Sequence, residues 1–279
     1  MTVEILHRAD LFALGLGRRA IDAALEAGAL IRARRDHYLP GDAPDELVRA
    51  ARVGGRLTCL SLLALLDVFV LTNARLHVHL PPSASRMRSP HDRRRQLEGR
   101  GRRGVRLHWM PVGRDPDRLV AVTIVDALVH SARCQAPRAF IASIDSALNQ
   151  GLISVADVAE IFRRLPRRFS SLRSLVDGRA ESGPETLMRL MLRTLGCTVE
   201  LQVSFDRIGR VDLLVNGWLV IECDSERYHS DWAAQEKDRR RDLALAARGF
   251  TPLRPTAAMI MWQPEMVLAA VRGILAARR

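Results

Sequence analysis

The sequence predicts a mixed fold of helices and strands, spanning the α+β and α/β classes. Segments of helical period alternate with short apolar segments of strand period along the 279 residues. The dipeptide Asn216-Gly217, a strong tight-turn signal, joins two such strands near the C-terminal end. A polar, weakly patterned stretch at 166–183 precedes the last part of the chain. These observations predict domains at 1–44, 45–165 and 184–279, with 166–183 as a linker.

The composition is that of a folded protein, with 48% apolar and 27% charged residues. The most apolar stretch, Leu57 to Leu71, is broken by Asp67 and falls short of the roughly 20 residues that span a bilayer. Residues 1–15 contain acids and lack the pattern of a signal peptide. No two cysteines have CxxC spacing, which argues against a zinc cluster or a disulfide framework. We therefore expect a cytoplasmic protein without membrane contact.

The net charge of +12 is concentrated in one segment. Residues 81–120 carry +7, against +1 for 1–80, +3 for 121–180 and +1 for 181–279. Nine arginines lie between Arg86 and Arg106. Such a segment attracts polyanions, of which nucleic acid is the commonest in a cytoplasm, although charge does not distinguish DNA from RNA. The alternative is a solvated, arginine-rich loop in a chain whose only lysine is Lys237.

The N-terminal domain is predicted to contain two short helices and a basic hairpin. Residues 7–15 and 18–28 have helical period and end at glycines, and residues 30–41 alternate around a polar turn. Helix, helix and basic hairpin is the outline of a winged helix, which binds DNA through its second helix and its wing. The candidate DNA contacts, each of which has exposed solvation as its alternative, are Arg18, Arg19, Arg34 and Arg35.

The middle domain is predicted to be mixed α/β. Residues 45–70 suggest a helix pair, and strands follow at 74–80 and 105–112. Pro81-Pro82 and a serine-rich run mark the segment between those strands as a loop. Helices are expected at 123–132, 137–149 and 155–165. The loop supplies further candidate DNA contacts, namely Arg93, Arg94, Arg95, Arg102 and Arg103.

The order of these N-terminal elements resembles the AbiEi-type antitoxin family. The shared features are the helix-helix-hairpin start, the hairpin end at His37-Tyr38, the glycine-rich turn into a serine-containing helix at 54–61, and Thr123 to Asp126 at the opening of a helix. The resemblance implies DNA binding through a winged helix, often to regulate the protein's own promoter.

The C-terminal domain is predicted in the order α-β-β-β-α-β. Residues 184–196 form an amphipathic helix with Pro184 at its start and Gly196 at its end. Three strands are expected at 198–203, 210–215 and 218–223. A long polar helix at 232–248, a strand at 250–254 and a closing helix at 264–277 follow.

Three acids lie in or beside the apolar strands of this domain. Asp212 interrupts the second strand, and Glu222 and Asp224 end the third. A carboxylate buried without a partner is costly, and the hairpin turn brings the start of one strand to the end of the other. A hard divalent cation such as Mg²⁺ is the natural counter-charge for carboxylates that converge in this way. The sequence therefore predicts a metal site at Asp212, Glu222 and Asp224.

These acids are part of a pattern that resembles the PD-(D/E)XK nuclease superfamily, with Glu185 on the preceding helix. Val211-Asp212, Ile221-Glu222-Cys223-Asp224, Tyr228-His229, the run Asp238 to Arg241 and Arg254 more closely resemble a bacterial domain related to very-short-patch-repair endonucleases. The resemblance covers about 95 residues and implies a restriction-endonuclease-like fold that cleaves DNA with Mg²⁺ or Mn²⁺.

The resemblance also implies a role for each matching residue. Asp212 and Glu222 would hold the metal together with the backbone carbonyl of Cys223. Asp224 would be a further ligand or would orient water, and Glu185 would reach the metal through water. His229 would act as a general base or contact the scissile phosphate, the alternative being a histidine that caps the next helix.

The pattern departs from the family at two positions. Ser225 stands where the family has glycine, and Asp224 occupies the place of the superfamily's lysine. Lys237 on the next helix could supply a displaced cation, or it could be an ordinary surface lysine. Arg240 and Arg241 on the same helix could bind phosphate, or they could form a solvated face paired with Asp238 and Asp242.

Two hypotheses of function follow. The first is a metal-dependent DNA endonuclease that hydrolyses phosphodiester bonds in repair or defence. The second is an AbiEi-like DNA-binding regulator or antitoxin whose nuclease-like domain is inactive. RNA as the substrate is a third option. The sequence is also compatible with a homodimer and with a toxin or a repair protein as binding partner.

Overall fold

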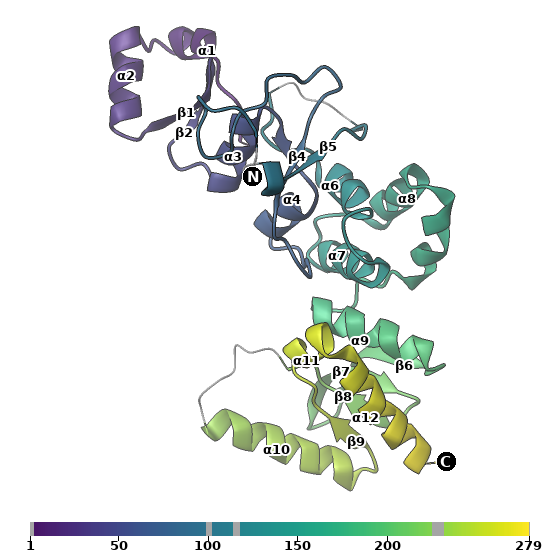
Figure 1. The fold of residues 1–279 in the computed structure, drawn as a ribbon. Coiled ribbons are helices and arrows are strands. Elements are labelled where there is room, and N and C mark those ends of the chain that lie inside the picture. Colours follow the sequence, from purple (N-terminus) through teal and green to yellow (C-terminus); the bar gives the residue numbers. More distant parts are fainter. Residues whose placement is uncertain (1–2, 99–101, 114–117, 225–231, 279) are drawn as a thin grey trace. The chain divides into compact units, whose positions relative to one another are not determined.

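The computed structural model describes residues 3–98, 102–113, 118–224 and 232–278, and Figure 1 shows their fold. The chain forms two compact units. The first comprises Met1–Gln135 with Val155–Arg167, and the second comprises Ala136–Ser154 with Arg168–Arg279. Both contain helices and strands, so the mixed α+β class is confirmed. No described helix is long and apolar enough to cross a lipid bilayer.

The predicted helices and hairpin at the start of the chain are confirmed. They are α1 (Arg8–Ala13), α2 (Arg18–Glu26), β1 (Leu30–Arg34) and β2 (His37–Pro40). Leu11, Ile21 and Tyr38 form the buried cluster that holds these elements together. The backbone of Leu6 also exchanges two hydrogen bonds with that of Tyr38, so residues before α1 extend the hairpin.

A three-stranded sheet lies at the centre of the rest of the first unit. Its order is β3-β4-β5, with β4 antiparallel to β3 and parallel to β5. Helix α4 packs on β4 and on α6, and α6 packs on α8. The elements are α3 (Asp45–Val53), β3 (Arg56–Leu57), α4 (Cys59–Leu65), β4 (Leu76–His79), β5 (Val105–His108), α6 (Ile124–Ser131) and α8 (Val155–Arg164).

Asp126 anchors the start of α6. Its buried carboxylate accepts hydrogen bonds from the Thr123 hydroxyl at 2.6 Å, the Gly113 backbone N–H at 2.9 Å and Arg164 Nη2 at 2.6 Å. Burial acts to raise the pKa of Asp126, but the bonds from Thr123, Arg164 and Gly113 together hold it below its usual value. The ionised carboxylate therefore stabilises the first unit.

We expect Asp126→Asn to lower the free energy of unfolding of the first unit by about 1.5–3 kcal/mol at neutral pH, because a charged acceptor is lost beside Arg164. Since the folded-state pKa is depressed, this stabilisation is complete above the unfolded-state pKa of about 3.9 and is lost as the pH falls through the folded-state value. The difference from wild type should therefore shrink below about pH 4. Calorimetry over a pH series measures the difference in the free energy of unfolding, and Asp22→Asn, at an exposed position, is the control. A difference that does not change with pH would show that the ionised Asp126 carboxylate is not the stabilising group.

The second unit is built on a four-stranded sheet in the order β6-β7-β8-β9. β6, β7 and β8 are antiparallel neighbours, and β9 pairs parallel to β8. Figure 1 shows α9 and α12 beside this sheet. Its strands are β6 (Val199–Phe205), β7 (Gly209–Val215), β8 (Leu219–Ile221) and β9 (Thr251–Leu253). Its helices are α7 (Pro137–Asn149), the 3₁₀ helix η1 (Arg167–Leu175), α9 (Gly183–Thr194), α10 (Trp232–Ala247), α11 (Ala257–Trp262) and α12 (Pro264–Ala277).

The compact units differ from the predicted domain boundaries in three ways. The predicted domain 1–44 is not a separate unit, because it lies in the first unit together with most of 45–165. Helix α7 was assigned to the middle domain, yet it packs on α9 and belongs to the second unit. The predicted linker, 166–183, contains η1, and its Asp177 backbone N–H binds the buried Asp145 of α7 at 2.8 Å. Polar composition suggested a linker here, whereas hydrogen bonds to buried groups fix the segment.

Candidate carboxylate site

The β7–β8 hairpin brings Asp212 next to the end of β8. The register pairs Leu213 with Ile221, so Asp212 and Glu222 each lie one residue beyond the last registered pair. Asn216 and Gly217 have φ values of 51° and 74°, the left-handed conformation that this tight turn requires. The backbone N–H of Cys223 donates to Asp212 Oδ2 at 2.8 Å. The predicted approach of the two strand ends is therefore present.

Glu222 is buried and lies between two arginines. Its Oε1 is 3.0 Å from Arg241 Nη2, and its Oε2 is 3.1 Å from Arg254 Nη1. Despite the Arg241 ion pair, Oε1 has no hydrogen bond of normal geometry among the described residues. Glu222 thus has a buried oxygen with capacity for another ligand.

Arg254 connects the acids of β8 to those of α10. Besides Glu222, its guanidinium lies 3.3 Å from Asp224, 2.9 Å from Asp242 and 3.9 Å from Asp238. Asp224 is partly exposed and is fixed by backbone bonds to Pro255 and Ala257. The positive charge that balances these carboxylates in the described structure therefore comes from arginine side chains.

Glu185 enters from the start of α9, where Ser182 caps the helix. Its carboxylate accepts hydrogen bonds from Gln202 Nε2 at 2.8 Å and from the backbone N–H of Glu181 at 2.9 Å. Gln202 has a left-handed φ of 57° and stands opposite Asp212, where no pair is registered although the register of β6 with β7 is the same on both sides. Gln202 could not be predicted as a partner of Glu185, because a left-handed residue in the middle of a strand pattern has no local signal.

Burial raises the pKa of all four carboxyls. For Glu185, the neighbouring Asp212 raises the pKa further. For Asp212, the Cys223 N–H and Arg241 oppose the effect of burial, while Asp224 adds to it. For Glu222 and Asp224, Arg254 is the main opposing charge. The acids are close enough to repel one another, so a cation among them would be stabilising.

The remaining predicted residues of this unit lie in different settings. His229 lies outside the described residues. Lys237 is exposed on α10, and Arg240 pairs with Glu236 at 2.7 Å. Arg241, predicted to bind DNA, is mostly buried and paired with Glu222, and it also donates to the Arg210 carbonyl. In the described structure Arg241 therefore belongs to the carboxylate site.

Most of the predicted DNA-contacting arginines of the first unit are at its surface. Arg93 is half-buried, and those that are exposed are Arg18, Arg19, Arg35, Arg94, Arg95, Arg102 and Arg103. Arg34 differs, because its guanidinium donates to the carbonyls of Val53 and Arg86 and lies against Gly54. Its contacts give Arg34 a structural role in the described structure.

A group of cysteine and histidine side chains that could hold a metal ion lies in the first unit. Cys59, His77, His108 and Cys134 have ligand atoms that all lie within 4.8 Å of one another, and together they can hold a metal ion. Among the described residues no other group of three or more such side chains is so compact. The spacing of the cysteines argued against a zinc cluster, yet the fold places two of them in a group that could hold a metal ion. The signal available in the sequence was the position of His77 between two apolar residues of a strand. In the structure His77 is as buried as these neighbours.

A comparison with models of protein families gave no match for this chain, and a comparison with curated proteins also gave none.

Proposed function

We propose that this protein is a metal-dependent DNA endonuclease whose active site is formed by Asp212, Glu222, Asp224 and Glu185. The observation that carries the proposal is the convergence of Asp212 and Glu222 at the open end of the β7–β8 hairpin, with Glu185 brought close by α9. The pattern of these acids resembles that of PD-(D/E)XK nucleases, and the order of strands and helices after α9 agrees with that resemblance.

The donor set fits Mg²⁺ or Mn²⁺. Both are hard cations that prefer oxygen ligands, and Glu222 Oε1 is a buried oxygen with no hydrogen bond of normal geometry to the residues that the structure describes. Asp212, Glu222 and the Cys223 carbonyl would hold the ion, with Asp224 as a further ligand. When bound, such an ion lowers the pKa of a water and stabilises charge on a phosphate.

The protein's own side chains would position the reactants. Glu185, held by Gln202 and the Glu181 backbone, would accept a hydrogen bond from the attacking water. Arg241 and Arg254 carry the positive charge beside Glu222 and would bind a non-bridging phosphate oxygen. His229 and Lys237 follow the acids in the sequence. In this proposal His229 would act as a general base or contact the scissile phosphate, and Lys237 would supply the displaced cation.

The first unit would position the DNA. Its start, α1-α2-β1-β2 with Leu6 paired to the hairpin, has the order of elements of a winged helix. Arg18 and Arg19 are exposed on α2, the helix that would enter the groove. The arginines between β4 and β5 would contact the phosphate backbone.

The pairing of Glu222 and Asp224 with arginine favours a second candidate function. Arg254 by itself pairs with three carboxylates, those of Glu222, Asp224 and Asp242. Such pairing would fit an inactive nuclease-like domain. In that case the protein would be an AbiEi-like DNA-binding regulator or antitoxin. It would bind duplex DNA, including its own promoter, and leave the strands intact.

The test is a cleavage assay with the full chain. Duplex, mismatched, branched and single-stranded DNA, and matched RNA, are each incubated with Mg²⁺, Mn²⁺, Ca²⁺ or EDTA. We expect Mg²⁺ or Mn²⁺ to support cleavage of at least one DNA substrate and EDTA to stop it. DNA binding without cleavage of any substrate would favour the regulator, and cleavage of RNA alone would replace DNA as the substrate.

We also expect the loop arginines to contribute to DNA binding. The triple variant Arg93→Ser, Arg94→Ser, Arg95→Ser should bind duplex DNA more weakly. It should also reduce the slope of log K against log salt by about 2–3, since each lost phosphate contact removes about 0.9. Fluorescence anisotropy over a salt series measures the slope. The control replaces the exposed Arg167, Arg193 and Arg207 by serine. Equal slopes in the two triple variants would place the loop outside the DNA footprint.

A further inference from the structure

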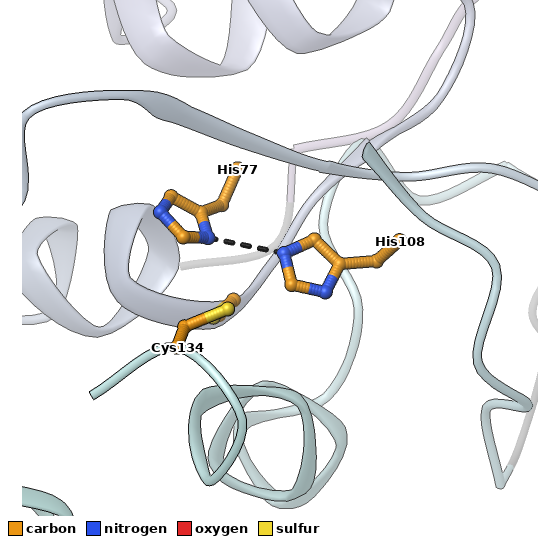
Figure 2. Close-up of side chains that lie close together, drawn as sticks. His77, His108 and Cys134 are labelled. Atoms are coloured by element: carbon orange, nitrogen blue, oxygen red, sulfur yellow. Dashed lines mark hydrogen bonds between the residues drawn. The ribbon is translucent and has the colours of Figure 1, made fainter. Parts of the chain in front are cut away.

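Two cysteines and two histidines from distant parts of the sequence meet inside the first unit. Cys59 begins α4, His77 lies on β4, His108 lies on β5, and Cys134 lies in the turn after α6. Figure 2 shows His77, His108 and Cys134 directed toward one another. His77 Nδ1 is 3.0 Å from His108 Nε2, and the four ligand atoms lie within 4.8 Å of one another.

The folded chain holds these groups in place from both the strands and the helices. β4 and β5 are parallel neighbours, with His77 paired to Arg106 and His79 to His108, so the two imidazoles project from adjacent strands. Cys59, His77 and His108 are buried. Cys59 also has a left-handed φ of 53°, which is a strained conformation for a residue with a side chain. The surrounding structure therefore determines the position of Cys59 closely.

We propose that Cys59, His77, His108 and Cys134 bind one Zn²⁺ ion. Two sulfur and two nitrogen donors are the set of structural zinc sites, whereas Mg²⁺ and Mn²⁺ prefer oxygen. Zn–S bonds of about 2.3 Å and Zn–N bonds of about 2.0–2.1 Å require a tighter group than 4.8 Å, so the bound ion would draw the four ligand atoms together. Two thiolates also balance the charge of the ion, which a buried site requires.

Four protein ligands leave no open position, so the ion has a structural role. It links the start of α4, the central strands and the end of α6, which lie far apart in the sequence. A cavity of about 330 Å³ reaches His77 and Cys134 from the side of Arg75, Arg106 and Arg133. Two of the four ligands are therefore reached from a cavity.

The test measures metal binding by the reduced full-length chain. Zinc content after gel filtration should be about one ion per chain. Replacement by Co²⁺ should give the intense visible bands of a tetrahedral site together with a thiolate-to-cobalt charge-transfer band. Cys134→Ser and His108→Ala should each weaken Zn²⁺ binding by more than about a hundredfold. The control Cys197→Ser, which removes a buried thiol of the second unit, should bind like wild type.

Two further variants keep the test decisive. His108→Cys conserves a zinc ligand and should retain the ion, with a stronger charge-transfer band, even if the cysteine variants do not fold. The double variant Asp212→Asn, Glu222→Gln should keep the cobalt spectrum, so the failure of this site and the failure of the nuclease proposal can be told apart. Wild-type protein without zinc, a cobalt spectrum without thiolate bands, or an unchanged spectrum in Cys59→Ser with Cys134→Ser would overturn the proposal.

Discussion

Replacing Asp212 by asparagine is expected to slow metal-dependent DNA cleavage by at least about a thousandfold, equivalent to roughly 4 kcal/mol of barrier. Asparagine keeps the shape of the side chain and can still accept the hydrogen bond from the Cys223 N–H. It removes the negative charge that would hold the divalent ion. Since the charge is lost and the fold is kept, both catalysis and the affinity for Mn²⁺ should fall.

The measurement is the single-turnover cleavage rate of wild type and variant at saturating Mg²⁺ or Mn²⁺, with Mn²⁺ affinity by calorimetry. The matched control is Asp206→Asn in the exposed turn between β6 and β7, which should cleave and bind like wild type. Equal rates for Asp212→Asn and wild type on every substrate that is cleaved would exclude Asp212 from the active site.

The core of the carboxylate site could be predicted because its signals are local. Asn216-Gly217 determines the turn and hence the register of β7 with β8. The apolar residues around Asp212 and before Glu222 determine which strand faces are buried, so the positions of both acids follow from the sequence. The long polar run of α10 and the proline at the start of α12 are equally local signals.

The partners of these acids could not be predicted, because they depend on tertiary packing. Arg254 follows β9, and only the parallel pairing of β9 with β8 brings it to Glu222 and Asp224. Gln202 reaches Glu185 from a left-handed backbone conformation in β6 that a strand pattern does not show. The sequence therefore indicates where the negative charge lies, and it singles out Arg241 and Arg254 without showing that they pair with these acids.

The Cys/His cluster was missed for a similar reason. Metal sites are recognised in a sequence by short spacings between ligands, and these four residues are each separated by many positions. The parallel pairing of β4 with β5 and the packing of α4 on α6 bring them together. Leu76 and Val78 marked one buried face of β4, but His77 and His79 on its other face are buried too.

Replacing Arg189 by methionine is expected to destabilise the second unit by about 3–5 kcal/mol. Arg189 on α9 lies 2.7 Å from Asp145 on α7, and both side chains are buried. Asp145 also accepts hydrogen bonds from the Thr186 hydroxyl and the Asp177 backbone N–H. Burial raises the pKa of Asp145 to about 6, against the opposing effect of Arg189. Methionine would fill the space and leave the carboxylate buried without its cation.

Urea unfolding followed by tryptophan fluorescence suits this measurement, because Trp218, Trp232 and Trp262 all lie in the second unit. The control Arg193→Met changes an exposed arginine of the same helix and should alter the free energy of unfolding by less than about 0.5 kcal/mol. The double variant Asp145→Leu, Arg189→Met removes both charges, so it should recover much of the stability that the single variant loses. We attribute the loss of stability in Arg189→Met to the unpaired Asp145 carboxylate. If the double variant is no more stable than Arg189→Met, the cause is lost packing and not the unpaired charge.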